Sequence, residues 1–167
     1  GGGPPQVGLV VSGAAAEAAA LAAAGDPVVH VAARAIADPF AADTALFLAE
    51  AFAGDRSVIA VIGHANSAAS LAASQIYNRS GLVQIAPTTT ATAYSRAGPY
   101  SFRMVPGDDQ QARFLARALH SSWPAARRIA VIYVNDDYGR SFYRELGPLL
   151  DSAALDVVFD GLYTEAG

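Results

Sequence analysis

The stretch that decides the fold is SVIAVIGHANSAASLAASQIYNRSGLVQIAP (57–87). It begins with an apolar run of strand length, 57–63, which is typical of a strand buried on both faces of a parallel sheet. Small polar residues follow, and then a segment at 67–80 with helical patterning that Gly81 ends. A second short apolar run occupies 82–87. The stretch is therefore predicted to form a strand, a helix and a second, parallel strand.

The same alternation continues on both sides of this unit. Further strands are predicted at 7–12, 27–36, 100–106, 127–135 and 155–163. Further helices are predicted at 14–24, from Asp43 as N-cap to Gly54, from Asp108 or Asp109 as N-cap onward, and from 137 onward with an interruption at Gly147 and Pro148. Strands that alternate with helices at this spacing predict an α/β fold, a doubly wound parallel sheet.

Composition excludes several classes of protein. The chain has 167 residues, enough for one domain or two small ones, and its hydrophobic fraction of 53% includes no run near the roughly 18 apolar residues of a membrane span. The net charge is −4, and the eleven basic residues are scattered arginines, so no nucleic-acid partner is expected. Without cysteine there is no disulfide framework, thiolate nucleophile or cysteine-based metal site.

The segment RMVPGDDQQ (103–111) has the composition of a hinge between two alternating sets. We predict a flexible start at 1–6, a first α/β lobe at 7–106 and the beginning of a second α/β lobe, incomplete, at 107–167. The second set has too few strands to cover its own sheet. We therefore expect the chain to continue in the native protein or a partner to cover this lobe.

Ligands of open α/β sheets lie at the carboxyl ends of the strands, which draws attention to the residues after each predicted strand. Three such segments are rich in small residues and in hydroxyl or amide side chains: 63–67 after one strand, 87–90 after the next, and 135–139 after a third. Ser67 opens a predicted helix, where its hydroxyl and the backbone N–H groups of the first turn can bind a carboxylate. Thr90 offers similar donors. The alternative is that Ser67 is only an N-cap and 88–90 a polar turn.

Catalytic patterns are absent. His64 has no partner at the spacing of a catalytic triad or metal site, so a structural or cleft-lining role is expected. The adjacent acids Asp136 and Asp137 are expected to cap the following helix. The phosphate-binding, dinucleotide-binding and nucleophile-elbow motifs do not occur. We therefore expect no enzyme, no catalytic residue, no cofactor and no metal.

Three stretches together resemble a known family. They are VIAVIGHANSAASLAASQIYNRSGLVQIAPTTTATAYS, YSFRMVPGDDQQARFLARAL and RRIAVIYVNDDYGRSFYRELGPLLDSAALDVVFDGLYTEAG. In order and spacing they are similar to the type I periplasmic substrate-binding proteins of ABC transporters, of the branched-chain amino-acid (Leu/Ile/Val) type. The resemblance covers about two-thirds of the chain, and the family's chains are about twice as long. It implies two lobes that close on a small solute.

The resemblance also implies roles for particular residues. Ser67 matches a serine that binds the ligand carboxylate, and Ala65 and Asn66 match the pocket lining before it. Thr88 matches a position whose backbone carbonyl accepts a hydrogen bond from the ligand ammonium. Thr90 matches a threonine that contacts both the carboxylate and the ammonium of the ligand. Tyr138 matches an aromatic residue of the second lobe that covers the ligand.

The implied function is uptake of an amino acid or related small carboxylate, with an ABC permease as partner. The implied location is periplasmic or extracellular, with or without a lipid anchor. Two alternatives stay open at this point: a ligand-sensing module of a membrane receptor with the same fold, and, more distantly, a small α/β enzyme.

Overall fold

The structure is a computed structural model that describes residues 6–11, 32–37 and 42–164. The chain divides into two compact units. The first comprises Gly1–Thr89 and Tyr94–Val105, and the second comprises Thr90–Ala93 and Pro106–Gly167. The lobe boundary after residue 106 stays a prediction.

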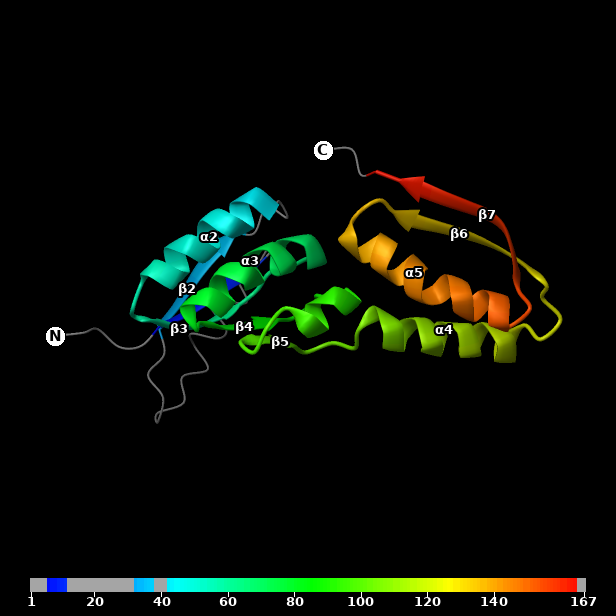
Figure 1. The fold of residues 1–167 in the computed structure, drawn as a ribbon, viewed down its shortest axis with the longest axis horizontal. Helices are drawn as coiled ribbons and strands as arrows, with labels where there is room; N and C mark the ends of the chain where they lie inside the picture. The colour runs from blue at the N-terminus through cyan, green and yellow to red at the C-terminus, as the bar shows by residue number, and fades with distance from the viewer. Residues whose placement is uncertain (1–5, 12–31, 38–41, 165–167) are drawn as a thin grey trace. The chain divides into compact units, whose positions relative to one another are not determined.

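The first unit contains a five-stranded parallel sheet (Figure 1). Its strands are β1 (Gln6–Val11), β2 (Ala32–Ala37), β3 (Val58–Ile62), β4 (Val83–Ala86) and β5 (Ser101–Arg103), in the spatial order β2-β1-β3-β4-β5. All four neighbouring pairs are parallel, which confirms the predicted sheet. The predicted helix at 14–24 and the start of the strand predicted at 27–36 lie outside the described residues.

Two helices, α2 (Ala42–Gly54) and α3 (Ser67–Ser80), pack against each other and against the sheet (Figure 1). The buried core between them includes Phe52 of α2, Tyr77 of α3 and Val61 of β3. Alternate residues of a strand face opposite sides of the sheet, so Val61 and its neighbour in register, Gln84, face this core together. A 3-10 helix, η1 (Thr92–Arg96), follows the loop after β4.

The ends of these helices test two predictions. Gly81 adopts a left-handed conformation (φ 72°) and its N–H caps α3, as predicted for a C-terminal glycine. The prediction for Asp43 is wrong, because α2 already begins at Ala42 and Asp43 lies within its first turn. A carboxylate there still interacts favourably with the N-terminal end of the helix dipole.

The second unit consists of α4 (Asp108–Ser122), β6 (Arg128–Val134), α5 (Asp137–Ser152) and β7 (Asp156–Tyr163). The two strands pair in parallel and α5 connects them. Helices α4 and α5 pack together beside the strands (Figure 1). Their shared core contains Ala112 and Ala116 of α4, Leu146 and Leu150 of α5, and Leu155.

Two predictions about these helices are wrong. The N-cap of α4 is Gly107, which has no side chain to cap with, and both candidate aspartates lie in the first turn. Helix α5 runs without interruption through Pro148. Proline removes one backbone hydrogen bond, but Leu146 and Leu150 on either side of it are buried in the core and hold both halves of the helix in place.

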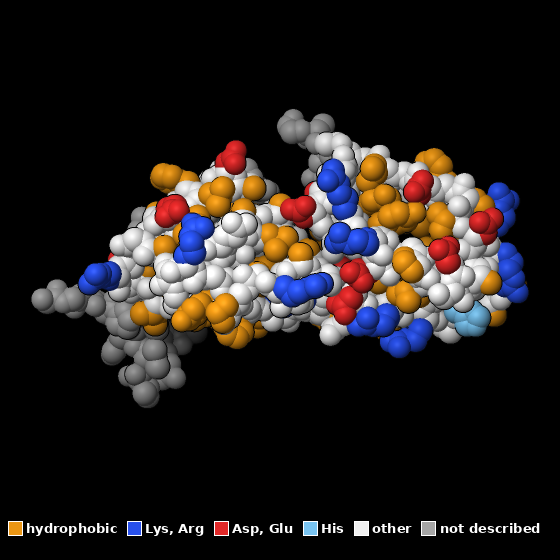
Figure 2. All heavy atoms as spheres, in the orientation of Figure 1, with side chains coloured by type: hydrophobic (Ala, Val, Ile, Leu, Met, Phe, Trp, Pro, Cys, Tyr) orange, Lys and Arg blue, Asp and Glu red, His pale blue; other side chains and the backbone are white. Residues whose placement is uncertain are grey.

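The sheet of the second unit has one face turned away from the helices. Phe159 and Ile132 lie on this face, where the ring of Phe159 covers the space above Gly161, and both side chains are exposed. Figure 2 shows hydrophobic side chains at the surface of this unit. Among the described residues, no helix is both long enough and apolar enough to cross a membrane.

Candidate functional site

The loop after β3 ends at the N-cap of α3. Asn66 is that cap: its backbone is extended (φ −133°, ψ 168°) and its Oδ1 accepts a hydrogen bond from Ala69 N at 2.8 Å. The alternative that Ser67 is the N-cap is therefore wrong. Ser67 is the first helical residue and is almost completely buried. Its position places both its N–H and its hydroxyl in the first turn, where backbone N–H groups have no acceptor within the helix.

The loop after β4 meets the loop after β3, because the two strands are neighbours in the sheet. Thr88 Oγ1 donates to Ala65 O at 2.7 Å. Thr89 Oγ1 donates to Ser70 Oγ, in the first turn of α3, at 2.5 Å. The structure thus brings together Ala65, Asn66, Ser67 and Thr88, which were predicted from two separate stretches of sequence.

His64 lies behind this loop. Its side chain is fully buried, its Nε2 lies 3.3 Å from Tyr77 OH, and the two rings stack. Its backbone N–H donates to Ser70 Oγ at 3.1 Å. A fully buried imidazole packed in the core agrees with the structural role expected for His64, and no group of three or more potential metal ligands occurs in the part of the chain that the structure describes.

Thr90 and Tyr138 belong to the second unit. Thr90 O accepts from Asp108 N, at the start of α4, at 2.8 Å. Tyr138 lies in the first turn of α5, which follows the carboxyl end of β6. The N-cap of α5 is Asp136, as expected, and its Oδ1 accepts from Gly139 N at 2.7 Å, whereas Asp137 lies within the first turn and is not a cap. A single site formed by all six predicted residues stays a prediction.

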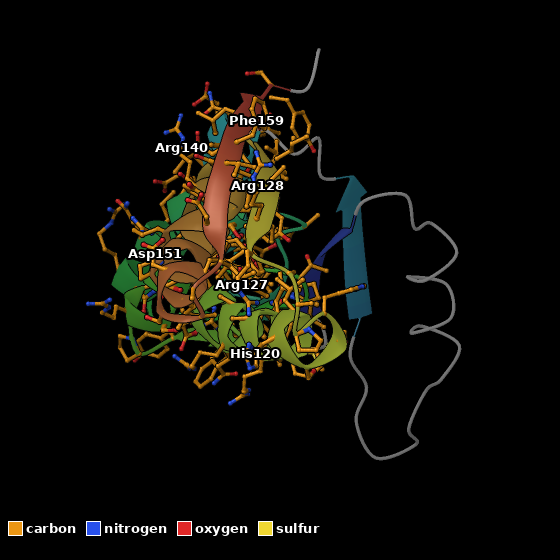
Figure 3. All side chains as sticks on the ribbon, turned by 90° about the vertical axis from the view of Figure 1, so that its right-hand side faces the viewer. His120, Arg127, Arg128, Arg140, Asp151 and Phe159 are labelled. Atoms are coloured by element: carbon orange, nitrogen blue, oxygen red, sulfur yellow. The ribbon has the colours of Figure 1, made fainter. Side chains whose placement is uncertain are left out.

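Charged and titratable side chains lie at both ends of the second unit's strands (Figure 3). Arg140 lies at the end where β6 stops and α5 begins, and donates to Asn135 Oδ1 at 2.6 and 2.8 Å. His120 and Arg127 lie at the other end, where α4 stops and β6 begins. Tyr138 therefore shares the strand-end position that open α/β sheets use for ligands.

Tyr138 has an apolar environment. It lines a cavity of about 410 Å³ in the second unit, together with Phe142, whose ring centre is 6.2 Å from that of Tyr138, and with Tyr163 at the end of β7. Burial, and then the carboxylates of Asp108 and Asp136, raise the pKa of Tyr138, so the phenol stays neutral at physiological pH. A neutral aromatic ring here can cover the apolar part of a solute.

Sequence reasoning assigned no role to three buried polar residues beside the loop: Ser70, Gln84 and Thr89, the last of which lies in the segment 87–90 noted after its strand. Gln84 gave one signal, because it interrupts the apolar strand LVQIAP. Its side chain is fully buried, and its Nε2 donates to Gly63 O at 3.1 Å and approaches Ser70 O at 3.4 Å. Ser70 and Thr89 gave no such signal, since serine in a helix and threonine in a turn are usually exposed.

The chain matches the family model described as "Receptor family ligand binding region" over residues 14–166. It is 35% identical over 86 residues to the Leu/Ile/Val-binding protein homolog 1 of Brucella abortus (strain 2308), which is 51% of this chain and 23% of the relative. It is 31% identical over 106 residues to an amino acid binding protein of Pseudomonas aeruginosa, which is 62% of this chain and 28% of the relative.

Among solved structures, the chain is similar to an ABC transporter substrate-binding protein from Desulfitobacterium hafniense, in complex with Leu. The TM-score is 0.80 at 25% identity, over 97% of this chain and 51% of that chain. The chain thus spans about half the length of this structure, and its match to the curated relatives covers about a quarter of theirs. The likeness confirms the fold predicted from the sequence.

Proposed function

The chain belongs to the receptor-family ligand-binding regions, and on this premise we propose that it is part of an extracytoplasmic solute-binding protein of an ABC uptake system. The solute is an amino acid or a related small carboxylate, and the protein delivers it to an ABC permease. It binds without chemical change to the solute and needs no cofactor. The names of the similar proteins support this function, since they are amino-acid-binding and substrate-binding proteins.

The observation that carries the proposal is the start of α3. Ser67 is the first residue of α3, after the loop 63–66 that follows β3, and the loop after β4 is hydrogen-bonded to this loop through Thr88 and Ala65. A helix N-terminus favours an anion through its dipole and its backbone N–H groups. We assign the ligand carboxylate to Ser67, with Asn66 and Ala65 lining the pocket.

The remaining roles follow from the family resemblance. The backbone carbonyl of Thr88 accepts from the ligand ammonium, and Thr90 contacts both polar groups of the ligand. Tyr138 covers the apolar part, which agrees with the neutral phenol and apolar cavity described above. These three roles rest on the match of residues to the family pattern.

Isothermal titration calorimetry against a panel of L-amino acids and small carboxylates tests the proposal. The Ser67→Ala variant removes one hydrogen bond to a charged group, so we expect its affinity for the solute to fall by about tenfold or more. Ser80→Ala is the matched control, because Ser80 lies at the opposite end of α3 and is exposed. An unchanged affinity in Ser67→Ala contradicts the assignment of the carboxylate to Ser67.

A further inference from the structure

Four consecutive backbone carbonyls between β3 and α3, those of residues 63–66, each accept a hydrogen bond from outside the loop. The donors are Gln84 Nε2 to Gly63 O (3.1 Å), Ser70 Oγ to His64 O (3.2 Å), Thr88 Oγ1 to Ala65 O (2.7 Å) and Ser70 N to Asn66 O (3.0 Å). Three of the four donors are side-chain groups. Side chains of α3, β4 and the loop after β4 therefore set the direction of the carbonyls of residues 63–65, and the first backbone hydrogen bond of α3 sets that of Asn66.

The Ser70 hydroxyl is the centre of this arrangement. It accepts from His64 N at 3.1 Å and from Thr89 Oγ1 at 2.5 Å, and donates to His64 O at 3.2 Å. A serine hydroxyl has one proton to donate and two lone pairs to accept, so its capacity is used completely. Thr89 Oγ1 lies 3.4 Å from Asn66 O, and the shorter contact assigns its single proton to Ser70.

Burial makes these hydrogen bonds significant. The side chains of Ser70, Thr89 and Gln84 are all fully buried. A hydroxyl or amide in the interior costs free energy unless it is hydrogen-bonded, and apolar side chains of similar size would fill the same space without that cost. We therefore attribute to these polar side chains the orientation of the loop's backbone, in addition to the filling of space.

The geometry has a direct effect on the backbone N–H groups. In a planar trans peptide the N–H points opposite to the carbonyl of the preceding residue. The peptide bonds 64–65 and 66–67 are trans. The Ser70 hydroxyl holds the carbonyl of His64, and so turns the N–H group of Ala65 to the opposite side. The carbonyl of Asn66 accepts the ordinary helical hydrogen bond from Ser70 N, so the helix backbone itself orients the N–H group of Ser67.

We infer that Ser70 and Thr89 are positioning residues that make the loop selective for a carboxylate over its neutral amide, an inference that rests on the proposed function. Ala65 and Ser67 are two of the residues assigned to the ligand. Because the carbonyls of residues 63–66 all accept hydrogen bonds within the protein, the loop favours a solute group that only accepts hydrogen bonds. A carboxylate is such a group, whereas a primary amide also carries donors and is a weaker acceptor.

The test compares two variants of Thr89 that differ by one group. Thr89→Val keeps the shape and removes the hydroxyl, and Thr89→Ser keeps the hydroxyl and removes the methyl group. The probes are L-leucine and L-leucinamide, and calorimetry gives the ratio of their affinities. We expect the preference for leucine to fall about tenfold in Thr89→Val and to stay within about twofold of wild type in Thr89→Ser. Thr89→Ala, which introduces no new atoms, replaces Thr89→Val if that variant does not fold.

Other outcomes overturn the inference. A structural defect alone would weaken both probes equally, so an unchanged ratio in Thr89→Val excludes a positioning role. An equal loss of preference in Thr89→Val and Thr89→Ser assigns the effect to the methyl group and likewise contradicts the inference.

If the wild-type protein binds no amino acid or carboxylate, the proposed function fails, and amide hydrogen exchange decides the positioning role separately. NMR would follow the N–H group of Ala65 in the same variants, with that of Ser67, which the helix backbone orients, as the internal control. We expect faster exchange at Ala65 in Thr89→Val than in Thr89→Ser, and no difference at Ser67. Equal exchange in the two variants would show that the hydroxyl does not hold the loop.

Discussion

Tyr94, in η1, is a buried phenol within the first unit. Its side chain is 1% exposed and its hydroxyl donates to Phe102 O at 3.4 Å. Burial raises the pKa of Tyr94 to about 12, against a usual value of 10.0, although Ser101 and Arg103 partly oppose the rise. The neutral form is therefore strongly preferred in the folded protein.

This pKa predicts a loss of stability at alkaline pH. In the unfolded chain the phenol ionises near pH 10, whereas the folded chain keeps its proton until about pH 12. The stabilisation of about 2–3 kcal/mol is thus complete below pH 10 and disappears as the pH rises to 12. Urea unfolding at a series of pH values should give a steeper decline for wild type than for Tyr94→Phe. Identical declines would contradict the assignment to Tyr94.

At the scale of elements, the start of α5 is fixed by its contact with the end of β6. A Cβ atom added to Gly139 would come within 2.0 Å of Val134 O, a backbone atom that cannot move independently of the strand. Gly147, in the same helix, has open space at the corresponding position. The two glycines therefore provide a matched pair of test sites.

We expect Gly139→Ala to lower the free energy of unfolding by about 1–3 kcal/mol, because the helix must move away from β6. Gly147→Ala should change it by less than about 1 kcal/mol, because the gain in helix propensity is opposed by the restriction on a residue before proline. Urea denaturation measures both. An equal effect of the two substitutions would exclude close contact at Gly139.

At the scale of the molecule, the described residues form two hydrophobic clusters. One joins α2, α3 and β3, with Phe52 near its centre, and the other joins α4 and α5, with Leu150 fully buried. No residue belongs to both clusters as described. We therefore expect each unit to have its own free energy of local unfolding.

Native-state hydrogen exchange can measure this independence. Leu150→Ala leaves a cavity and should destabilise its unit by about 2–5 kcal/mol, so amides in α4 and α5 exchange faster while those in α2 and α3 do not change. Phe52→Ala is the reciprocal control and should affect α2 and α3 alone. Faster exchange throughout the chain in both variants would mean that it unfolds as one cooperative body.

Much of the fold could be predicted from local patterns. The continuous apolar run at 57–63 and the mostly apolar segment 82–87 identified two strands, and Gly81 marked a helix end, because burial and left-handed backbone leave clear sequence signals. The helix break predicted at Pro148 was wrong, because the packing of the buried Leu146 and Leu150 outweighs the low helix propensity of one proline. Asn66 and Ser67 are both good N-cap residues, so their order alone did not decide between them.

The candidate site was only partly predictable. Strand ends located Ser67 and Thr88, since neighbouring parallel strands end at the same edge. The supporting residues Ser70 and Thr89 depend on contacts across 19 positions of sequence, which no local pattern contains. The same holds for Thr90, whose place in the second unit follows from its contact with Asp108.

The short segment Thr90–Ala93 has a consequence for exchanging parts between relatives. It lies in the sequence between two stretches of the first unit, yet its backbone partners are Asp108 N and Ser141 Oγ, which belong to the second. A chimera joined at a single point near residue 105 would pair this segment with a foreign helix start. Recombination that keeps native contacts must therefore transfer Thr90–Ala93 with Pro106–Gly167, which sets three crossover points instead of one.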